Sequence, residues 1–261
     1  MSAILLDGGI VHYEVIGRGR PVIFLHGWVG SWRYWIPALQ SVGMNFRAYA
    51  IDMWGFGDTA REPANYSLEK QTAMVDQFLQ ELGMGKVALV GHGLGGLVGL
   101  LYALRHPNVV DRIMAVDVPV DLAGVNPRLR SDSLPALADW LGGKTPETEP
   151  ARADAVKADP TAIAASFNDP DWFNIAEKLL GMNSACLMVY GQNDPAISIP
   201  PLDPALTSSM LHLLILEGLG HFPMLEDTAR FNSLLTDFFA LDSGESPRDL
   251  QLKEEWKRRV R

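Results

Sequence analysis

The chain has 261 residues, of which 48% are hydrophobic and 20% charged, so it can bury the core of one large α/β domain or two small ones. Its formal net charge of −9 argues against a nucleic-acid-binding surface, which needs clustered cations. The single cysteine excludes an intramolecular disulfide and makes the cytoplasm the default location, and no uncharged apolar run reaches the length of about 18 residues expected of a membrane span.

The first third of the chain contains three predicted strands and one predicted helix. Residues 9–16, 20–25 and 46–51 are β-rich runs bounded by polar or glycine-containing turns. A helix is expected to begin after Ser67, a good N-cap residue, and to continue through Leu82, because apolar side chains recur there at helical spacing.

Short apolar strands and helices alternate in the middle of the chain. Residues 86–90 and 110–116 are predicted strands, and a helix over about 94–105 separates them. Apolar strands that alternate with helices are typical of a mostly parallel sheet with helices on both faces. We therefore assign the chain to the α/β class.

A segment rich in proline, alanine and aspartate then interrupts this alternation. Residues 119–178 contain only short amphipathic pieces, and we interpret them as an inserted helical cap. The sheet is expected to resume at 185–190 and 212–216, and a final helix to cover about 223–240. The predicted organisation is a core of residues 1–118 and 179–241, a cap of residues 119–178 and a C-terminal tail of residues 242–261. We expect the tail to be solvated, with a basic amphipathic partner-binding helix as the alternative.

A glycine-rich turn at residues 90–96 fits two different chemistries. Gly91, Gly93 and Gly96 match the spacing G-x-G-x-x-G of a dinucleotide-binding turn, and Asp117 follows 26 residues after Gly91, where a ribose-binding acid would stand. The same turn matches the nucleophile elbow G-x-S-x-G if Gly93 occupies the serine position. The first interpretation predicts an oxidoreductase, and the second predicts an acyl-transfer enzyme.

Four motifs in register favour the second interpretation. They are His26–Trp28, Asp52–Asp58 (an Asp-x-x-Gly-x-Gly loop), Gly191–Pro195 and Gly220–Pro223. With these motifs and the turn at Gly93, residues 9–240 resemble the α/β-hydrolase superfamily. The dinucleotide interpretation explains neither Asp194 nor His221 and leaves about 85 residues before the turn without a role.

The resemblance implies an α/β-hydrolase fold, a helical cap and a defined set of site residues. It places the nucleophile at position 93, the acid at Asp194 and the catalytic histidine at His221, with the backbone N–H groups of Trp28 and Leu94 as the oxyanion hole. It implies a small-molecule substrate and no organic cofactor, and it says nothing of oligomeric state. The histidines form no H-E-x-x-H or similar ligand cluster, so we expect no metal.

Glycine at position 93 removes the atom that would attack the substrate. Three hypotheses follow: an inactivated form of an esterase-like hydrolase, an enzyme in which His221 and Asp194 activate water or move a proton, or a non-catalytic protein that binds a ligand. Glycine also accepts the positive φ of such a turn at little steric cost.

The remaining predictions concern the pocket and the neighbouring residues. Aromatic residues near the expected pocket mouth suit a small, apolar carbonyl or ester compound; we select Trp32, Trp54, Trp140 and Phe222. Asp117 is held as a reserve acid, and Cys186 is predicted to lie in the core. His26 and His92 are interpreted as packing residues, and Ser31 lacks the strained turn that a substitute nucleophile needs.

Overall fold

The structure is a computed structural model and describes residues 2–169, 175–201 and 208–250. The last eleven residues of the predicted tail, 251–261, and residues 170–174 of the predicted cap therefore lie outside the described residues. Within the described residues, no helix combines the length and the apolar character that crossing a membrane requires.

In the part of the chain that the structure describes, eight strands form a single sheet in the order β1-β2-β4-β3-β5-β6-β7-β8. Strand β2 pairs antiparallel with both of its neighbours, β1 and β4, and the strands from β4 to β8 are all parallel. The strands are β1 Ser2–Leu6, β2 Gly9–Gly17, β3 Arg20–Leu25, β4 Phe46–Ile51, β5 Val87–His92, β6 Val110–Val116, β7 Ala185–Gly191 and β8 Leu211–Leu216.

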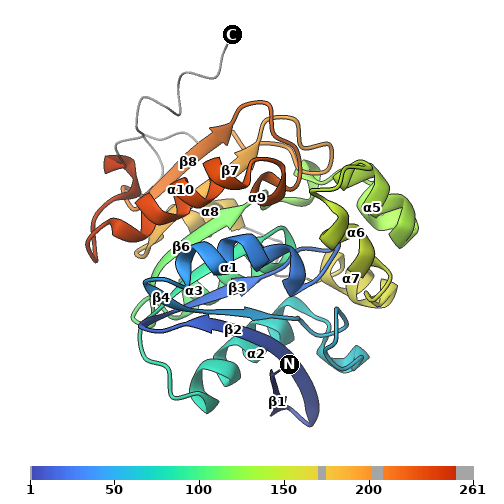
Figure 1. The fold of residues 1–261 in the computed structure, drawn as a ribbon, viewed down its shortest axis with the longest axis horizontal. Helices are drawn as coiled ribbons and strands as arrows, with labels where there is room; N and C mark the ends of the chain where they lie inside the picture. Colours follow the sequence, from blue (N-terminus) through green and yellow to red (C-terminus); the bar gives the residue numbers. More distant parts are fainter. Residues whose placement is uncertain (1, 170–174, 202–207, 251–261) are drawn as a thin grey trace.

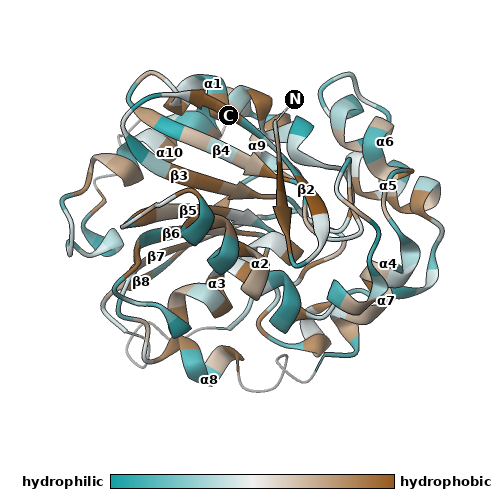
Figure 2. Ribbon diagram, turned by 90° about the horizontal axis from the view of Figure 1, so that it is seen from below, coloured by the Kyte–Doolittle hydropathy of each residue, from teal (hydrophilic) through white to brown (hydrophobic). Residues whose placement is uncertain are grey.

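Helices cover both faces of the sheet, as the alternation of elements predicts (Figure 1; Figure 2). Helices α1, α9 and α10 lie on one face, and α2, α3 and α8 lie on the other (Figure 2). These helices are α1 Ile36–Val42, α2 Leu68–Glu81, α3 Leu94–Arg105, α8 Ile175–Leu179, α9 Pro223–Glu226 and α10 Thr228–Ala240. The central strands are accordingly buried on both sides, and Cys186 in β7 is fully buried, which confirms its predicted place in the core.

A group of short helices between β6 and β7 lies beside the sheet (Figure 2). We call α4 to α7, with the turns that join them, the helical insertion; its helices are α4 Arg128–Ser131, α5 Leu134–Gly142, α6 Glu149–Ala155 and α7 Pro160–Phe167. Several polar contacts connect it to the loops that follow β3 and β4, among them those of Ser31 Oγ and Arg33 Nε with Asp154, of Lys157 Nζ with Asp58, and of Tyr66 Oη with Asp159.

Candidate active site

Gly93 occupies the sharp turn between strand β5 and helix α3. Its φ of +49° and ψ of −113° are strained for any residue with a side chain. The Gly93 N–H donates to the Val116 carbonyl at 2.9 Å, and the Gly93 carbonyl accepts from Leu97 in the first turn of α3. The turn therefore has the abrupt strand-to-helix geometry of a nucleophile elbow.

The other glycines of this turn are required by contacts within the protein itself. A Cβ on Gly91 would stand 2.4 Å from the Gly95 carbonyl oxygen, and one on Gly95 would stand 2.5 Å from the Leu25 carbonyl oxygen. A Cβ on Gly96 would meet Val118 at 2.1 Å. Close packing of α3 against the sheet thus accounts for the glycine spacing that suggested a phosphate cradle.

His221 and Asp194 form a buried hydrogen-bonded pair. The Nδ1 atom of His221 lies 2.8 Å from Oδ2 of Asp194, and both side chains are almost completely buried. The other carboxylate oxygen, Oδ1, accepts from the Ala196 N–H at 2.7 Å, which holds the carboxylate in the loop after β7. A histidine held in this way has its Nε2 atom available for proton transfer.

The pair lies next to the glycine turn. The imidazole of His221 is 4.6 Å, centroid to centroid, from that of His92, the residue that precedes Gly93. Burial lowers the pKa of His92 well below its usual value, and a charge on His221 lowers it further. His92 is therefore neutral, and its Nδ1 lies 3.0 Å from Tyr34 Oη, which accepts the Gly27 N–H. This placement agrees with the interpretation of His92 as a packing residue.

Trp28 covers position 93 with its side chain. A Cβ built on Gly93 would stand 3.1 Å from two carbon atoms of the Trp28 indole. The indole stacks on Phe167 of α7 with ring centroids 5.0 Å apart and donates its Nε1–H to Ser166 Oγ at 2.9 Å. The sequence predicted a role for Trp28 through its backbone N–H and a place for its side chain in the pocket lining, and the side-chain contact with Phe167 and Ser166 of the helical insertion is an additional finding.

A family model described as alpha/beta hydrolase fold matches residues 20–153, about half of the chain. The chain belongs to the alpha/beta hydrolase fold family. Two further features contradict the dinucleotide interpretation: the strand order differs from the 3-2-1-4-5-6 order of dinucleotide-binding sheets, and the glycines contact protein atoms.

Relatives of this hydrolase-fold chain are named as hydrolases. It is 27% identical over 280 residues to 2-hydroxy-6-oxo-2,4-heptadienoate hydrolase of Pseudomonas putida, a match that covers 93% of this chain and 97% of the relative. It is 29% identical over 114 residues to a soluble epoxide hydrolase of Corynebacterium sp., but that match covers only 44% of this chain and 40% of the epoxide hydrolase.

Solved structures with the same fold include two enzyme variants. The meta-cleavage product hydrolase of Pseudomonas fluorescens IP01, as an alanine variant of one serine, has a TM-score of 0.76 and 24% identity, covering 92% of this chain and 97% of that one. The N-acyl homoserine lactonase AidH, as a serine-to-glycine variant complexed with N-hexanoyl homoserine lactone, has a TM-score of 0.79 and 20% identity, covering 91% and 96%. At these identities the likeness establishes the fold.

The predicted pocket aromatics of the hydrolase-fold chain occupy different surroundings. The ring of Phe222 is 5.0 Å from that of His221. Trp32 lies 5.9 Å from His12, and the Trp54 indole contacts Gly9 in the hairpin of β1 and β2. Trp140 in α5 lies under the guanidinium of Arg128, 4.3 Å from it. Of these four, Phe222 therefore contacts the paired histidine directly, and the other three contact residues outside the site.

Leu94, the second predicted oxyanion donor, is the first residue of α3. The first N–H groups of a helix have no acceptor within the helix, so they are suited to hold an anionic oxygen. Leu94 follows Gly93 directly, which puts its N–H at the elbow.

Glu226 is a site-forming residue that the sequence analysis did not select. Its carboxylate accepts the N–H of Gly220 at 2.5 Å and that of Phe222 at 3.0 Å, so it clamps the backbone on both sides of His221. Glutamate in the first turn of a helix commonly accepts N–H groups just before that helix, and Pro223 begins α9. In the sequence, the glutamate that follows Pro223 at the start of a predicted helix could have indicated this role of Glu226.

Asp117 is fully buried directly after β6. Its Oδ1 accepts the Gly191 N–H at 2.8 Å, and its own N–H donates to Val189. Burial, reinforced by the charge of Asp194, raises the pKa of Asp117 well above its usual value, which favours its protonated form. Asp117, the alternative candidate for the catalytic acid, thus lies beside the loop that holds Asp194.

Other predicted or possible site residues are engaged in structural contacts. Ser31 donates to Asp154 and is buried. His12, Asp52 and Asp58 form a group whose ligand atoms could surround a cation, but His12 Nδ1 bonds Asp52 Oδ2 at 2.9 Å and Asp58 pairs with Lys157. These bonds give the group a structural role in fixing the loop after β4.

Proposed function

We propose that the protein hydrolyses a small, apolar carbonyl or ester compound bound between the sheet and the helical insertion, with the insertion acting as a cap. The observation that supports this proposal is the buried pair of His221 and Asp194 beside a glycine elbow. Without a side chain at position 93 no acyl-enzyme can form, so the attacking group has to be water.

In the proposed reaction, His221 acts as general base. Its Nε2 takes a proton from water as the water oxygen forms a bond to the carbonyl carbon, and Asp194 stabilises the resulting imidazolium. The N–H groups of Trp28 and Leu94 would hold the oxyanion, and His221 would return the proton to the leaving oxygen as the carbon–oxygen bond breaks.

A cavity in the helical insertion offers apolar surface to the proposed substrate class. It has a volume of about 330 Å³ and is lined by the apolar residues Leu134, Leu137 and Ile163 together with the polar residues Arg130, Asp132 and Ser133, among others. Ile163 lies on α7, the same helix that carries Ser166 and Phe167 to the Trp28 indole. An aliphatic or aromatic substituent placed there would be bound mainly by its apolar surface.

The role of His221 is tested by turnover of p-nitrophenyl butyrate. We expect His221→Ala to reduce the rate by about 10²–10⁴-fold, which is the usual contribution of general acid–base catalysis. His212→Ala, a change in a half-buried histidine of β8, is the matched control and should leave the rate unchanged. Equal turnover by both variants and the unaltered protein would exclude His221 as the base.

The role of position 93 is tested by comparing Gly93→Ser with Gly93→Ala. Both variants add a Cβ beside Trp28 and carry the same backbone strain, so they differ by the hydroxyl alone. We expect Gly93→Ser to gain fluorophosphonate labelling and on the order of a hundredfold or more in ester turnover, while Gly93→Ala gains neither. Such a gain would mean that the scaffold is an esterase that lacks one hydroxymethyl group.

The second candidate function is ligand binding without turnover, which glycine at position 93 favours. The serine-to-glycine lactonase variant, which was obtained with its lactone, illustrates that such a replacement is compatible with a bound ligand in that protein. A ligand that binds saturably and is recovered unchanged, together with turnover that His221→Ala does not affect, would favour this function.

The dinucleotide interpretation has a test of its own. We expect the addition of NAD(P) to leave the melting temperature of the protein unchanged.

A further inference from the structure

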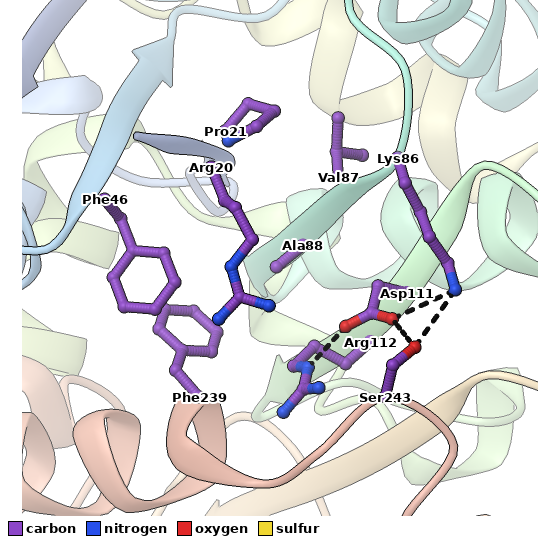
Figure 3. A pocket seen from close by; sticks show the side chains of 10 residues that line it. All are labelled: Arg20, Pro21, Phe46, Lys86, Val87, Ala88, Asp111, Arg112, Phe239 and Ser243. Carbon is purple, nitrogen blue, oxygen red and sulfur yellow. Dashed lines mark hydrogen bonds and ion pairs between the residues drawn. The ribbon is translucent and has the colours of Figure 1, made fainter. Parts of the chain in front are cut away.

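A second cavity lies at the opposite end of the parallel strands. It has a volume of about 170 Å³ and opens where β3, β5 and β6 begin, close to the end of α10 (Figure 3). Gly93, Asp194 and His221 all follow the other ends of their strands. Since β5 has six residues and a strand rises about 3.3 Å per residue, the two sites are separated by roughly 20 Å.

Asp111 supplies a carboxylate to this cavity, and both of its oxygen atoms have partners within the protein. Lys86 Nζ lies 3.1 Å from its Oδ1, Arg112 Nε lies 2.8 Å from its Oδ2, and Ser243 Oγ also donates to Oδ1. Although burial acts in the opposite direction, these hydrogen bonds lower the pKa of Asp111 to about 2, so it is ionised. One carboxylate is therefore shared by two cations.

Arg20 supplies a third cation to the same cavity. Its guanidinium carbon lies 5.4 Å from the centre of the Phe46 ring, and it forms no ion pair with any residue in the described ranges. In the view of Figure 3, the guanidinium lies between the rings of Phe46 and Phe239 on one side and the Asp111 cluster on the other. The cavity thus has an excess of positive charge, although the whole chain carries −9.

We propose that this cavity binds a small carboxylate that carries one aromatic ring or a short acyl chain. The carboxylate would pair with the Arg20 guanidinium, whose fork of N–H donors matches a carboxylate. The apolar group would contact Phe46, Phe239 and Ala88, which line the cavity. The volume is suitable, since an apolar protein cavity of about 150 Å³ accommodates benzene.

The proposal is tested by titrating the full-length protein with 4-fluorobenzoate and following the ligand by ¹⁹F NMR. We expect saturable binding that Arg20→Gln weakens about tenfold, because a charged hydrogen-bonded pair is lost. Arg18→Gln, a change in a neighbouring exposed arginine, is the control and should leave the affinity unchanged. The neutral analogue 4-fluorobenzyl alcohol should bind more weakly than the acid.

A second variant tests the cavity independently of the charge. Ala88→Leu places a larger side chain in the cavity and should abolish binding, with circular dichroism to show that the variant is folded. Binding that persists unchanged in both Arg20→Gln and Ala88→Leu would overturn the proposal, as would the absence of saturable binding. So would binding that is lost only when Trp28 is replaced, since the ligand would then occupy the candidate active site.

Discussion

Position 93 and the helical insertion are linked through a single side chain. The Trp28 indole lies over Gly93, and the same indole stacks on Phe167 and donates to Ser166. A side chain at position 93 would require the indole to move by a few tenths of an ångström, because the nearest contact would be 3.1 Å. A change at the elbow therefore affects how the insertion is held.

At Asp117 we predict that Asp117→Asn stabilises the protein increasingly as pH rises. In the unaltered protein the folded Asp117 retains its proton while the unfolded residue ionises above its ordinary pKa of 3.8, so stability present below that pH is lost as pH rises towards the raised folded pKa. Asparagine removes this loss and can still accept the Gly191 N–H.

Urea unfolding at several pH values measures this effect. The difference in unfolding free energy between variant and unaltered protein should grow by up to about 1.4 kcal/mol per pH unit above pH 4. A difference that stays constant across this range would contradict a protonated Asp117.

The residues that were predicted from the sequence are those with a characteristic local motif. Asp194 and His221 each stand in a short loop motif after a strand, and the structure brings these two side chains together. Glu226 and the Trp28 side chain were not predicted in their observed contacts. Their partners are backbone groups or residues of a distant segment, which no local pattern specifies.

Among the elements, helix α3 depends most directly on small residues. We predict that Gly91→Ala destabilises the protein by about 3 kcal/mol, because the new methyl group would stand 2.4 Å from the Gly95 carbonyl oxygen in backbone that cannot move aside. The matched control is Gly85→Ala, which has no atom within 4 Å of its Cβ and should change stability by less than about 1 kcal/mol. Thermal unfolding of both variants measures the effect, and similar melting temperatures would refute the prediction.

The predicted elements agree best with the structure where an N-cap residue directly precedes apolar residues at helical spacing. Helix α2 spans Leu68–Glu81, and Ser67 caps it by accepting the Lys70 N–H, as expected. The single final helix predicted over 223–240 is instead two helices, because Asp227 leaves the helical conformation and caps α10. Strand β1 was not predicted, since its pairing with β2 is a tertiary contact.

The helices of the insertion could not be assigned from sequence. Each is short, and three of them carry a proline at their first or second position, so neither periodicity nor length distinguishes them from turns. Their positions depend on contacts with the core, such as that of Asp159 with Tyr66.

At the scale of the whole molecule, Asp154 is the main polar connection between the insertion and the core. It is buried and accepts hydrogen bonds from Ser31 and Arg33. We predict that Asp154→Ala lowers the unfolding free energy by about 1–3 kcal/mol, because the buried Ser31 hydroxyl loses its acceptor. Asp139→Ala, which removes only an exposed pair with Lys144, should have little effect.

Hydrogen exchange distinguishes local from global effects of this change. Exchange in α6 and α7 should accelerate more in Asp154→Ala than exchange in β5 and β6, since the central strands do not depend on this contact. Uniform acceleration throughout the molecule would show that the insertion and the sheet unfold as one unit.

The reactivity of Cys186 reports the rate at which the sheet opens. Its thiol is the only one in the chain, it is fully buried in β7, and burial raises its pKa to about 12. A thiol reagent can therefore react only after β7 separates from its neighbours, so the labelling rate reports how often the centre of the molecule becomes exposed. No engineered probe is needed to time this event.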